Sequence, residues 1–230
     1  MDFVVPERVA ATELDRRLEQ MPSKWRALLG PHLQTWVDRG VFFDVESGAI
    51  FVGHRPTIAP FNYAFTLFPP VKPEDIERYE SVVEVTLPST VKDYLQAFNG
   101  GHFYEFGVRG AEMFYSYWPW PDKRAFWHCQ DMGGEYKIIQ RRKATRGNPM
   151  VFATRNSSLN GVQRYFQSDE QILSVDDKGK LCDRWVTVVD WVGREIDAAA
   201  AFTEEWRHAM EALNERYPPK PLRRRKVASK

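Results

Sequence analysis

Residues 76–101, IERYESVVEVTLPSTVKDYLQAFNGG, constrain the fold of this chain more than any other segment. Two runs of apolar side chains recur there with the 3.6-residue period of an α-helix, and a Leu-Pro corner separates them. The two stripes can be buried against each other or against a common sheet, so the segment predicts a pair of helices on a layered core. The first stripe is Ile76, Tyr79 and Val83, and the second is Val91, Tyr94, Leu95 and Phe98.

Proline and glycine mark where these helices start and stop. Pro73 and Pro88 each fix φ near the value that a first helical turn needs. The sequence Asn99-Gly100-Gly101 tolerates positive φ, so we expect the second helix to end there and the chain to reverse. Glu80 lies on the otherwise apolar first stripe, where it needs a partner such as a backbone N–H group or an Arg.

The ordered set of residues in this segment resembles the signature of the Smi1/Knr4 family, also called the SUKH superfamily. The resemblance implies an α+β fold, with a twisted, mainly antiparallel sheet flanked by helices and a helix after the last strand. The matching residues are Ile76, Glu80, Leu87, Pro88, Tyr94, Leu95, Asn99, Gly100 and Gly101. Leu87, Pro88, Asn99, Gly100 and Gly101 are explained by helix start, helix stop and packing, so we interpret the motif as structural.

The resemblance also implies a protein-binding function. Many bacterial members are immunity proteins that bind and neutralise polymorphic or contact-dependent toxins, often nucleases. Fungal members regulate cell-wall synthesis and signalling and carry long disordered flanks. This chain lacks such flanks, which favours the bacterial type.

Pattern and composition divide the chain into three parts. We expect residues 1–53 to form an N-terminal extension of short helices and a hairpin around Glu46-Ser47-Gly48, packed on the main domain. Residues 54–217 would form the Smi1/Knr4-like domain, with a strand at 63–68 and a type I′ hairpin at Asn160-Gly161. A terminal helix is predicted over about residues 191–217, with its apolar face at Phe202, Trp206, Met210 and Leu213.

The formal net charge of +1 conceals a strong asymmetry. Residues 218–230 contain six Lys or Arg and no acid, which leaves 26 basic and 31 acidic residues, or −5, for the rest of the chain. We expect this tail to be disordered because it has little to bury. It is either a solvated terminus or a tether to nucleic acid or another acidic surface.

Composition also restricts the compartment and the kind of site. The chain has no run of 18 apolar residues and no secretory signal pattern, so a cytoplasmic location is the expectation. Cys129 and Cys182 lie far apart without a CxxC partner, which argues against a zinc site and a disulfide framework. We therefore expect no metal and no cofactor.

No catalytic constellation stands out. His102 and Glu105 have i, i+3 spacing, but they fall at a predicted strand entry, where such residues face opposite sides. His128 and Cys129 are adjacent, and neighbours in sequence rarely point at each other as a nucleophile and base must. The sequence therefore favours a protein that is not an enzyme.

An aromatic-rich stretch at 114–127 has two interpretations. Its rings can pack in the core, since aromatic side chains dominate core burial. Alternatively, a proline-stiffened loop presents some of them to a partner, because Tyr and Trp are enriched at interface hot spots. Tyr117, Trp118 and Trp120 are the candidates for partner binding.

Taken together, these observations favour a non-enzymatic protein-binding module, most simply an immunity protein that occludes a toxin. The alternative is a cytosolic regulatory scaffold or adaptor that binds an endogenous partner and uses the basic tail as an additional contact.

Overall fold

The structure is a computed structural model that describes residues 7–45, 47–55, 62–104, 106–111, 132, 151–157, 161–168, 171–176, 178 and 180–216. The predictions for Glu46, Glu105, residues 112–131, which include the aromatic stretch, Asn160 and the tail therefore lie outside the described residues.

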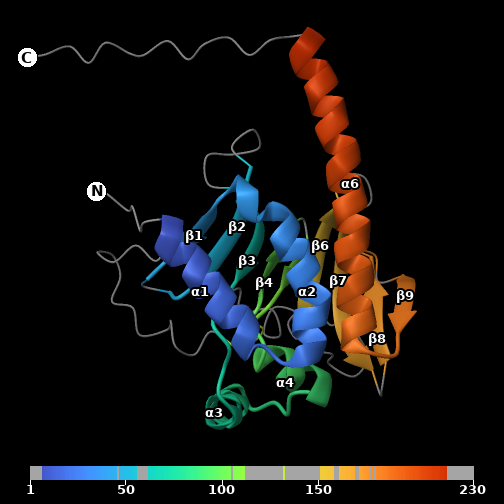
Figure 1. The fold of residues 1–230 in the computed structure, drawn as a ribbon. Helices are drawn as coiled ribbons and strands as arrows, with labels where there is room; N and C mark the ends of the chain where they lie inside the picture. The colour runs from blue at the N-terminus through green and yellow to red at the C-terminus, as the bar shows by residue number, and fades with distance from the viewer. Residues whose placement is uncertain are drawn as a thin grey trace, which may run out of the picture.

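The fold is built on one nine-stranded sheet in which every strand pairs antiparallel with the next strand in the chain. The order across the sheet is therefore β1 to β9 without a crossover (Figure 1). The strands are β1 (Val41–Phe43), β2 (Ile50–His54), β3 (Tyr63–Leu67), β4 (Gly101–Phe103), β5 (Phe106–Val108), β6 (Val151–Ser157), β7 (Gly161–Ser168), β8 (Gln171–Val175) and β9 (Leu181–Trp185).

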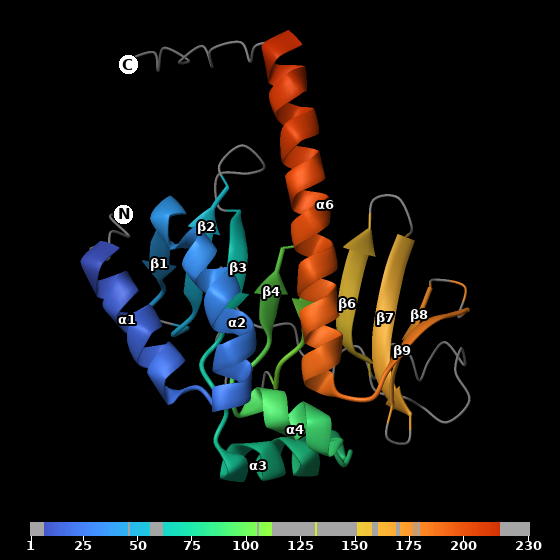
Figure 2. The same ribbon diagram turned by 45° about the vertical axis from the view of Figure 1, so that its right-hand side comes forward.

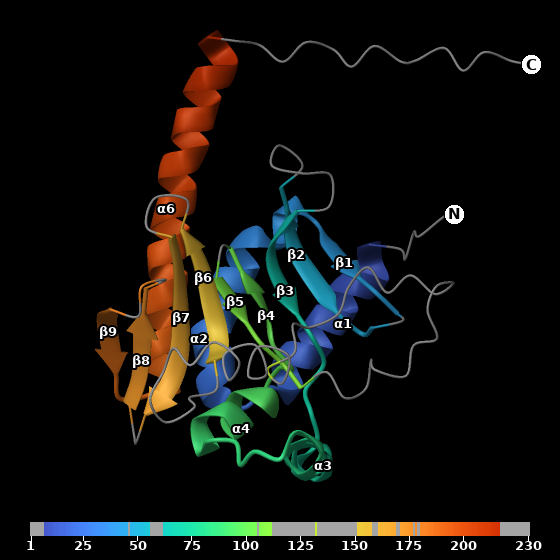
Figure 3. The same cartoon turned by 180° about the vertical axis from the view of Figure 1, so that it is seen from behind.

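Helices cover one face of this sheet and one of its ends. Figure 1 shows α1, α2 and α6 in front of the strands, and Figure 3, seen from behind, shows the strands in front of these helices. α3 and α4 lie together beyond one end of the strands (Figure 2). The prediction of an α+β fold with an antiparallel sheet flanked by helices is confirmed. The helices are α1 (Glu7–Gln20), α2 (Ser23–Trp36), the 3₁₀ turn η1 (Val37–Arg39), α3 (Pro73–Val83), α4 (Ser89–Leu95) and α6 (Val188–Arg216).

The core lies between the sheet and these helices, and aromatic rings form much of it. The strand period of two puts Phe65, Phe103 and Phe106 in register on one face, as the pairs Phe65–Phe103 and Phe103–Phe106. The edge of the Trp191 ring from α6 meets Phe106 and Phe152 at centroid distances of 5.2 and 5.1 Å. Such edge-to-face pairs add about 0.5–1.5 kcal/mol each beyond burial, so they fix α6 against the middle of the sheet.

The first 54 residues contribute directly to this sheet. The predicted hairpin is present, with β1 paired to β2 and β2 paired in turn to β3. Arg17 of α1 is buried and donates to the carbonyl oxygens of Gly48 and Leu67, the latter at 3.3 Å. One guanidinium thus joins α1 to the β1–β2 turn and to the end of β3.

α4 ends at Leu95, earlier than predicted, and the Asn99-Gly100-Gly101 segment beyond it is a point of close backbone approach. Gly100 has φ +75°, and a Cβ atom there would lie 2.7 Å from the Gly110 nitrogen. The buried Asn99 side chain accepts from the Ala111 N–H at 2.7 Å and donates to the Ala111 carbonyl at 3.1 Å. The amide of Asn99 therefore pairs with backbone as a neighbouring strand would, and glycine lets the two segments come this close.

The β6–β7 hairpin and the start of α6 differ slightly from their predicted positions. β6 and β7 do form the predicted hairpin, but Gly161 is already paired with Ser157, so residues 158–160 connect the strands. A two-residue turn at Asn160-Gly161 is therefore wrong, because this register leaves three residues between the strands. The terminal helix begins at Val188, slightly earlier than predicted, where the Thr187 hydroxyl accepts from the Asp190 N–H at 3.1 Å as an N-cap.

A buried acid attaches α6 to the sheet. Glu195 is 5% exposed and contacts Arg155 of β6 at 3.2 Å, while Tyr165 of β7 hydrogen-bonds the same carboxyl group. Burial raises the pKa of Glu195, the bonds to Tyr165 and Arg155 oppose this rise, and the nearby charge of Asp183 adds to it. Burial likewise raises the pKa of Tyr165.

The close approach at Gly100 predicts a large stability effect. Gly100→Ala should lower the free energy of unfolding by roughly 3 kcal/mol or more, because the new methyl group combines positive φ with backbone overlap. Gly30→Ala is the matched control, since a Cβ at Gly30 in α2 meets nothing within 4 Å. That change should be neutral or stabilise by up to about 1 kcal/mol. Urea unfolding measures both, and equal effects would contradict the close approach.

Glu195 predicts a pH dependence with a definite sign. Because its folded pKa is raised, its contribution to stability is complete below the ordinary glutamate range and is lost as the pH rises through the folded pKa. Glu195→Gln keeps a group that can bond Arg155 and Tyr165 but removes this titration. The variant should therefore gain stability relative to the natural chain with rising pH, by at most about 1.4 kcal/mol per pH unit. Urea unfolding at several pH values tests this, with Glu77→Gln on the exposed side of α3 as control; a pH-independent difference would refute it.

Candidate partner-binding surface

One carboxylate, that of Glu80, connects α3 to α4 at one end of the molecule. Glu80 of α3 accepts from the Leu87 N–H and from Lys92 Nζ of α4, the latter at 2.8 Å. Between them the chain turns at Glu84, which has φ +56°, and Pro88 precedes the first residue of α4. Glu80 thus connects the first helix to the Leu-Pro corner and to the second helix, so a single side chain sets the angle between them.

The inner sides of both helices are buried. Ile76 and Tyr79 of α3, and Val91, Tyr94 and Leu95 of α4, all belong to the main core. The Tyr94 hydroxyl donates to the Arg109 carbonyl at 2.8 Å, which connects α4 to the chain just after β5. The Trp25 indole of α2 donates to Asp93 at 3.3 Å and its ring meets Phe98 edge-on at 5.3 Å. These contacts bury the inner sides of both helices, whereas the outer side of α3 faces solvent.

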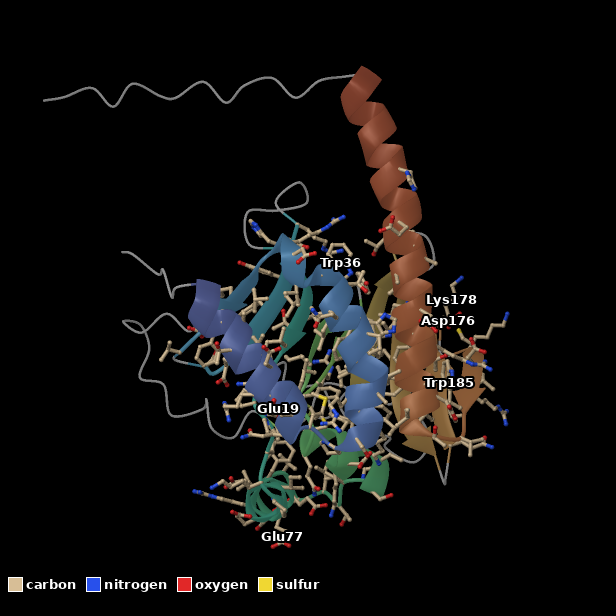
Figure 4. All side chains as sticks on the ribbon, in the orientation of Figure 1. Glu19, Trp36, Glu77, Asp176, Lys178 and Trp185 are labelled. Carbon is tan, nitrogen blue, oxygen red and sulfur yellow. The ribbon has the colours of Figure 1, made fainter. Side chains whose placement is uncertain are left out.

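That outer side is acidic. Residues 73–84 contain five carboxylates and one guanidinium, a net charge of −4. Glu74, Glu77 and Glu84 are exposed, and within the described part of the chain no ion pair is recorded for any of them. Figure 4 shows Glu77 at the far end of the molecule, pointing away from the sheet. We call the exposed side chains Glu74, Glu77, Val82 and Glu84 the acidic face of α3.

Arg78 and Lys72 are exposed basic side chains at this helix, whereas two other nearby lysines are paired with acids. Lys92 contacts Glu80, and Lys24 contacts Asp93 at 2.7 Å. Their charges are therefore directed toward the helix junction and do not neutralise the outer carboxylates. Val82 is 65% exposed and adds an apolar group to the acidic face. An exposed, mainly acidic patch with an apolar residue within it suits a positively charged protein surface.

The sequence-predicted residues fall into two groups. Glu80, Leu87, Pro88, Asn99, Gly100 and Gly101 lie at the helix junction and at the helix stop, where they contact the rest of the fold. Tyr117, Trp118 and Trp120 lie outside the described residues. The acidic face itself was missed, although the spacing of Glu74, Glu77 and Glu84 at three and seven residues was a readable signal of one helical side.

The residues considered for catalysis or metal binding are not brought together in the described structure. His102 lies on β4, where the protein packed around its ring and then the positive charge of Arg109 lower its pKa. Glu105, His128 and Cys129 lie outside the described residues, and Cys182 is a free, exposed thiol on β9. Among the described residues, no group of three or more His, Cys, Asp and Glu could hold a metal ion. None of the helices in the described ranges is both long and apolar enough to cross a membrane.

Glu80 predicts a specific stability effect. Glu80→Ala should lower the free energy of unfolding by about 1–3 kcal/mol, because the Leu87 N–H and Lys92 both lose their acceptor. Glu77→Ala removes an exposed carboxylate from the same helix and should change stability by no more than about 0.5 kcal/mol. Thermal and urea unfolding compare the two. If both variants were equally stable, Glu80 would not hold the junction.

Comparison with known proteins agrees with this geometry. Residues 70–194, which are 125 of the 230 residues, match the family model described as SMI1 / KNR4 family (SUKH-1). No curated protein and no solved structure matches the chain. The matched span contains the α3–α4 junction, strands β4 to β9 and the start of α6. Because this match covers more than half of its length, the chain belongs to the SMI1/KNR4 family (SUKH-1).

Proposed function

We propose that this protein is an immunity protein that binds a polymorphic or contact-dependent toxin in the cytoplasm and neutralises it by occlusion, without turnover. Members of the family are broadly immunity-type protein-binding domains and are generally not catalytic. The single observation that carries the proposal beyond the family is the acidic face of α3, whose carboxylates Glu74, Glu77 and Glu84 are exposed while Lys92 and Lys24 are paired with Glu80 and Asp93.

The charge of this face defines the kind of toxin that it suits. A nuclease must present a positive surface to its nucleic acid, and carboxylates that occupy that surface exclude the phosphate backbone. Complementary charge also accelerates association, which matters for a protein that must capture its target before damage occurs. We therefore propose a toxin with a basic active surface, and a nuclease is the first choice.

The acidic face cannot be the whole interface. A stable protein complex buries about 800 Å² on each partner, which is more than one exposed side of an 11-residue helix provides. Apolar anchors are also needed, because hot spots are enriched in Trp and Tyr. We propose that Tyr117, Trp118 and Trp120 supply such anchors, and that the carboxylates of α3 steer the partner toward them.

The decisive experiment is co-expression with the toxin encoded beside the gene. The proposal expects that cells carrying the toxin survive only when this protein is present, and that the two proteins copurify. Absence of both protection and complex would refute it. Purified toxin should lose activity in proportion to the amount of complex, because occlusion is stoichiometric.

Charge reversal on the acidic face should slow association. Glu77→Lys should reduce the association rate constant for the cognate toxin roughly tenfold at low salt, and the difference should shrink as salt screens it. Asp38→Lys makes the same charge change on η1, which follows Trp36 at the opposite end of the molecule (Figure 4), and should have little effect. Stopped-flow kinetics at two salt concentrations measure both variants. If both variants slowed association equally, the net charge of the protein would control the rate constant and the position of the charge on α3 would not matter.

The regulatory adaptor remains the second candidate because the basic tail contrasts with a body of net charge −5. Deletion of residues 218–230 separates the two functions. An immunity protein that binds through α3 keeps its protection after the deletion, whereas an adaptor that uses the tail loses its endogenous partner in pull-down experiments.

A further inference from the structure

Two points that are distant in sequence meet beside α4. β5 ends at Val108, and each of the next three carbonyl oxygens accepts a hydrogen bond. These are the carbonyls of Arg109, Gly110 and Ala111. The donor to Gly110 is the backbone N–H of Met132, at 3.1 Å, and both Met132 and Ala111 are fully buried. Residues 112–131 therefore leave the described fold and return to it at one place.

The donors to the other two carbonyls are side chains from α4 and from the turn after it. The Tyr94 hydroxyl donates to the Arg109 carbonyl at 2.8 Å and lies 3.3 Å from the Met132 sulfur. The Asn99 amide donates to the Ala111 carbonyl at 3.1 Å and accepts from the Ala111 N–H at 2.7 Å. Tyr94 thus contacts both the outgoing and the returning chain, while Asn99 fixes the last residue before the segment. We call Tyr94 and Asn99 the clamp.

Packing alone does not explain these two polar side chains. The Tyr94 ring packs on Phe98 and Phe152 at centroid distances of 5.7 and 6.4 Å, and a phenylalanine ring would make the same contacts. A buried hydroxyl or amide costs free energy unless it is hydrogen-bonded. Both side chains direct their polar atoms to the chain on either side of residues 112–131. The chemistry of the clamp therefore points to a task at the ends of this segment.

The clamp lies on the helix pair that carries the acidic face. Tyr94 follows Lys92 by two residues, and Lys92 contacts Glu80 of α3. Trp120 is the most distant in sequence of the three aromatic candidates and follows Ala111 by nine residues. Because an extended chain spans at most about 3.6 Å per residue, Trp120 must lie within about 32 Å of Ala111. By fixing Ala111, the clamp thus limits where all three aromatic candidates can be.

We propose that Tyr94 and Asn99 are positioning residues for partner binding, which act by holding both ends of residues 112–131 against α4. This inference rests on the immunity function proposed above, in which aromatic anchors of that segment and the carboxylates of α3 contact one toxin. A segment held at both ends loses less conformational entropy when it binds than a segment held at one end. The clamp therefore raises the affinity without touching the toxin.

Amide hydrogen exchange, measured by NMR on the full chain, tests the clamp without any partner. Asn99→Ala removes the acceptor of the Ala111 N–H, so exchange at Ala111 should accelerate about 100-fold or more. Exchange in β5 should change by less than about threefold, because β4 and β5 pair through their own backbone. If the Ala111 and β5 amides accelerate together, Asn99 supports the whole fold and the proposal is overturned.

Tyr94→Phe is the second variant, because it keeps the ring and loses only the hydroxyl. Exchange at Met132 should accelerate about tenfold, since the carbonyl next to its acceptor is released. Tyr104→Phe is the matched control. It removes the acceptor of the Trp36 indole N–H, also from a buried tyrosine, at the end of the molecule opposite α3 (Figure 4). This control should leave exchange at Met132 unchanged, and equal acceleration by both variants would contradict the clamp.

Calorimetric binding to the toxin encoded beside the gene tests the positioning role. Asn99→Ala and Tyr94→Phe should each weaken the complex about tenfold, whereas Tyr104→Phe should not weaken it. If both clamp variants bind as tightly as Tyr104→Phe, the positioning role is refuted even where exchange has shown the clamp. If the natural chain binds no toxin, the immunity function and the positioning role both fail, and the exchange measurements still decide whether the clamp exists.

Discussion

The backbone approach between residues 99–101 and 108–111 is the constraint on which the rest of the structure depends. At this point the last turn after α4 meets the strand pair β4–β5, and the distance is too short for any Cβ atom at Gly100 or Gly110. Asn99 closes the contact by pairing its amide with both backbone groups of Ala111. Buried polar groups must be paired, so removal of the Asn99 amide would leave the Ala111 backbone groups without their partners. The two hydrogen bonds also fix the position of residue 99 relative to residue 111.

Several features depend on that contact. Tyr94 reaches the Arg109 carbonyl only because α4 ends where it does. The angle of α4 in turn places Lys92 on Glu80 and so determines how α3 stands relative to the sheet. This structural motif therefore helps to decide in which direction the exposed carboxylates of α3 face.

Local chemistry made part of this fold predictable. The helix pair followed from apolar period, its starts followed from proline, and the β1–β2 hairpin followed from two β-rich runs around a turn. Each of these features depends on residues a few positions apart, which is the range over which sequence patterns act. The helix ends did not follow, because α3 ends at the left-handed Glu84 and α4 ends at Leu95, before Asn99-Gly100-Gly101. The predicted Asn160-Gly161 turn failed because Gly161 is already paired with Ser157, a register that leaves three residues between the strands.

Features that depend on distant residues could not be read from the sequence. Glu80 needed a partner, but nothing in the spacing singled out Lys92, twelve residues away across a corner. The burial of Glu195 beside Arg155, forty residues earlier, depends on how α6 crosses the sheet. The spacing of Glu74, Glu77 and Glu84 could have indicated one acidic side of α3, but charge counting does not say which carboxylates pair internally and which remain in solvent.

The strictly sequential order of the strands has a consequence for how such a protein changes over time. Because no strand is inserted between two others, the sheet can gain or lose strands at either edge without disturbing any existing pair. Strands β1 to β3 precede residue 70, where the family match begins, and they occupy one edge of the sheet. The first strand within the matched residues is β4, and β3, β2 and β1 continue the sheet outward from it. A sheet of this kind can therefore be enlarged by strands added at an edge, while the hydrogen bonds between the existing strands stay unchanged.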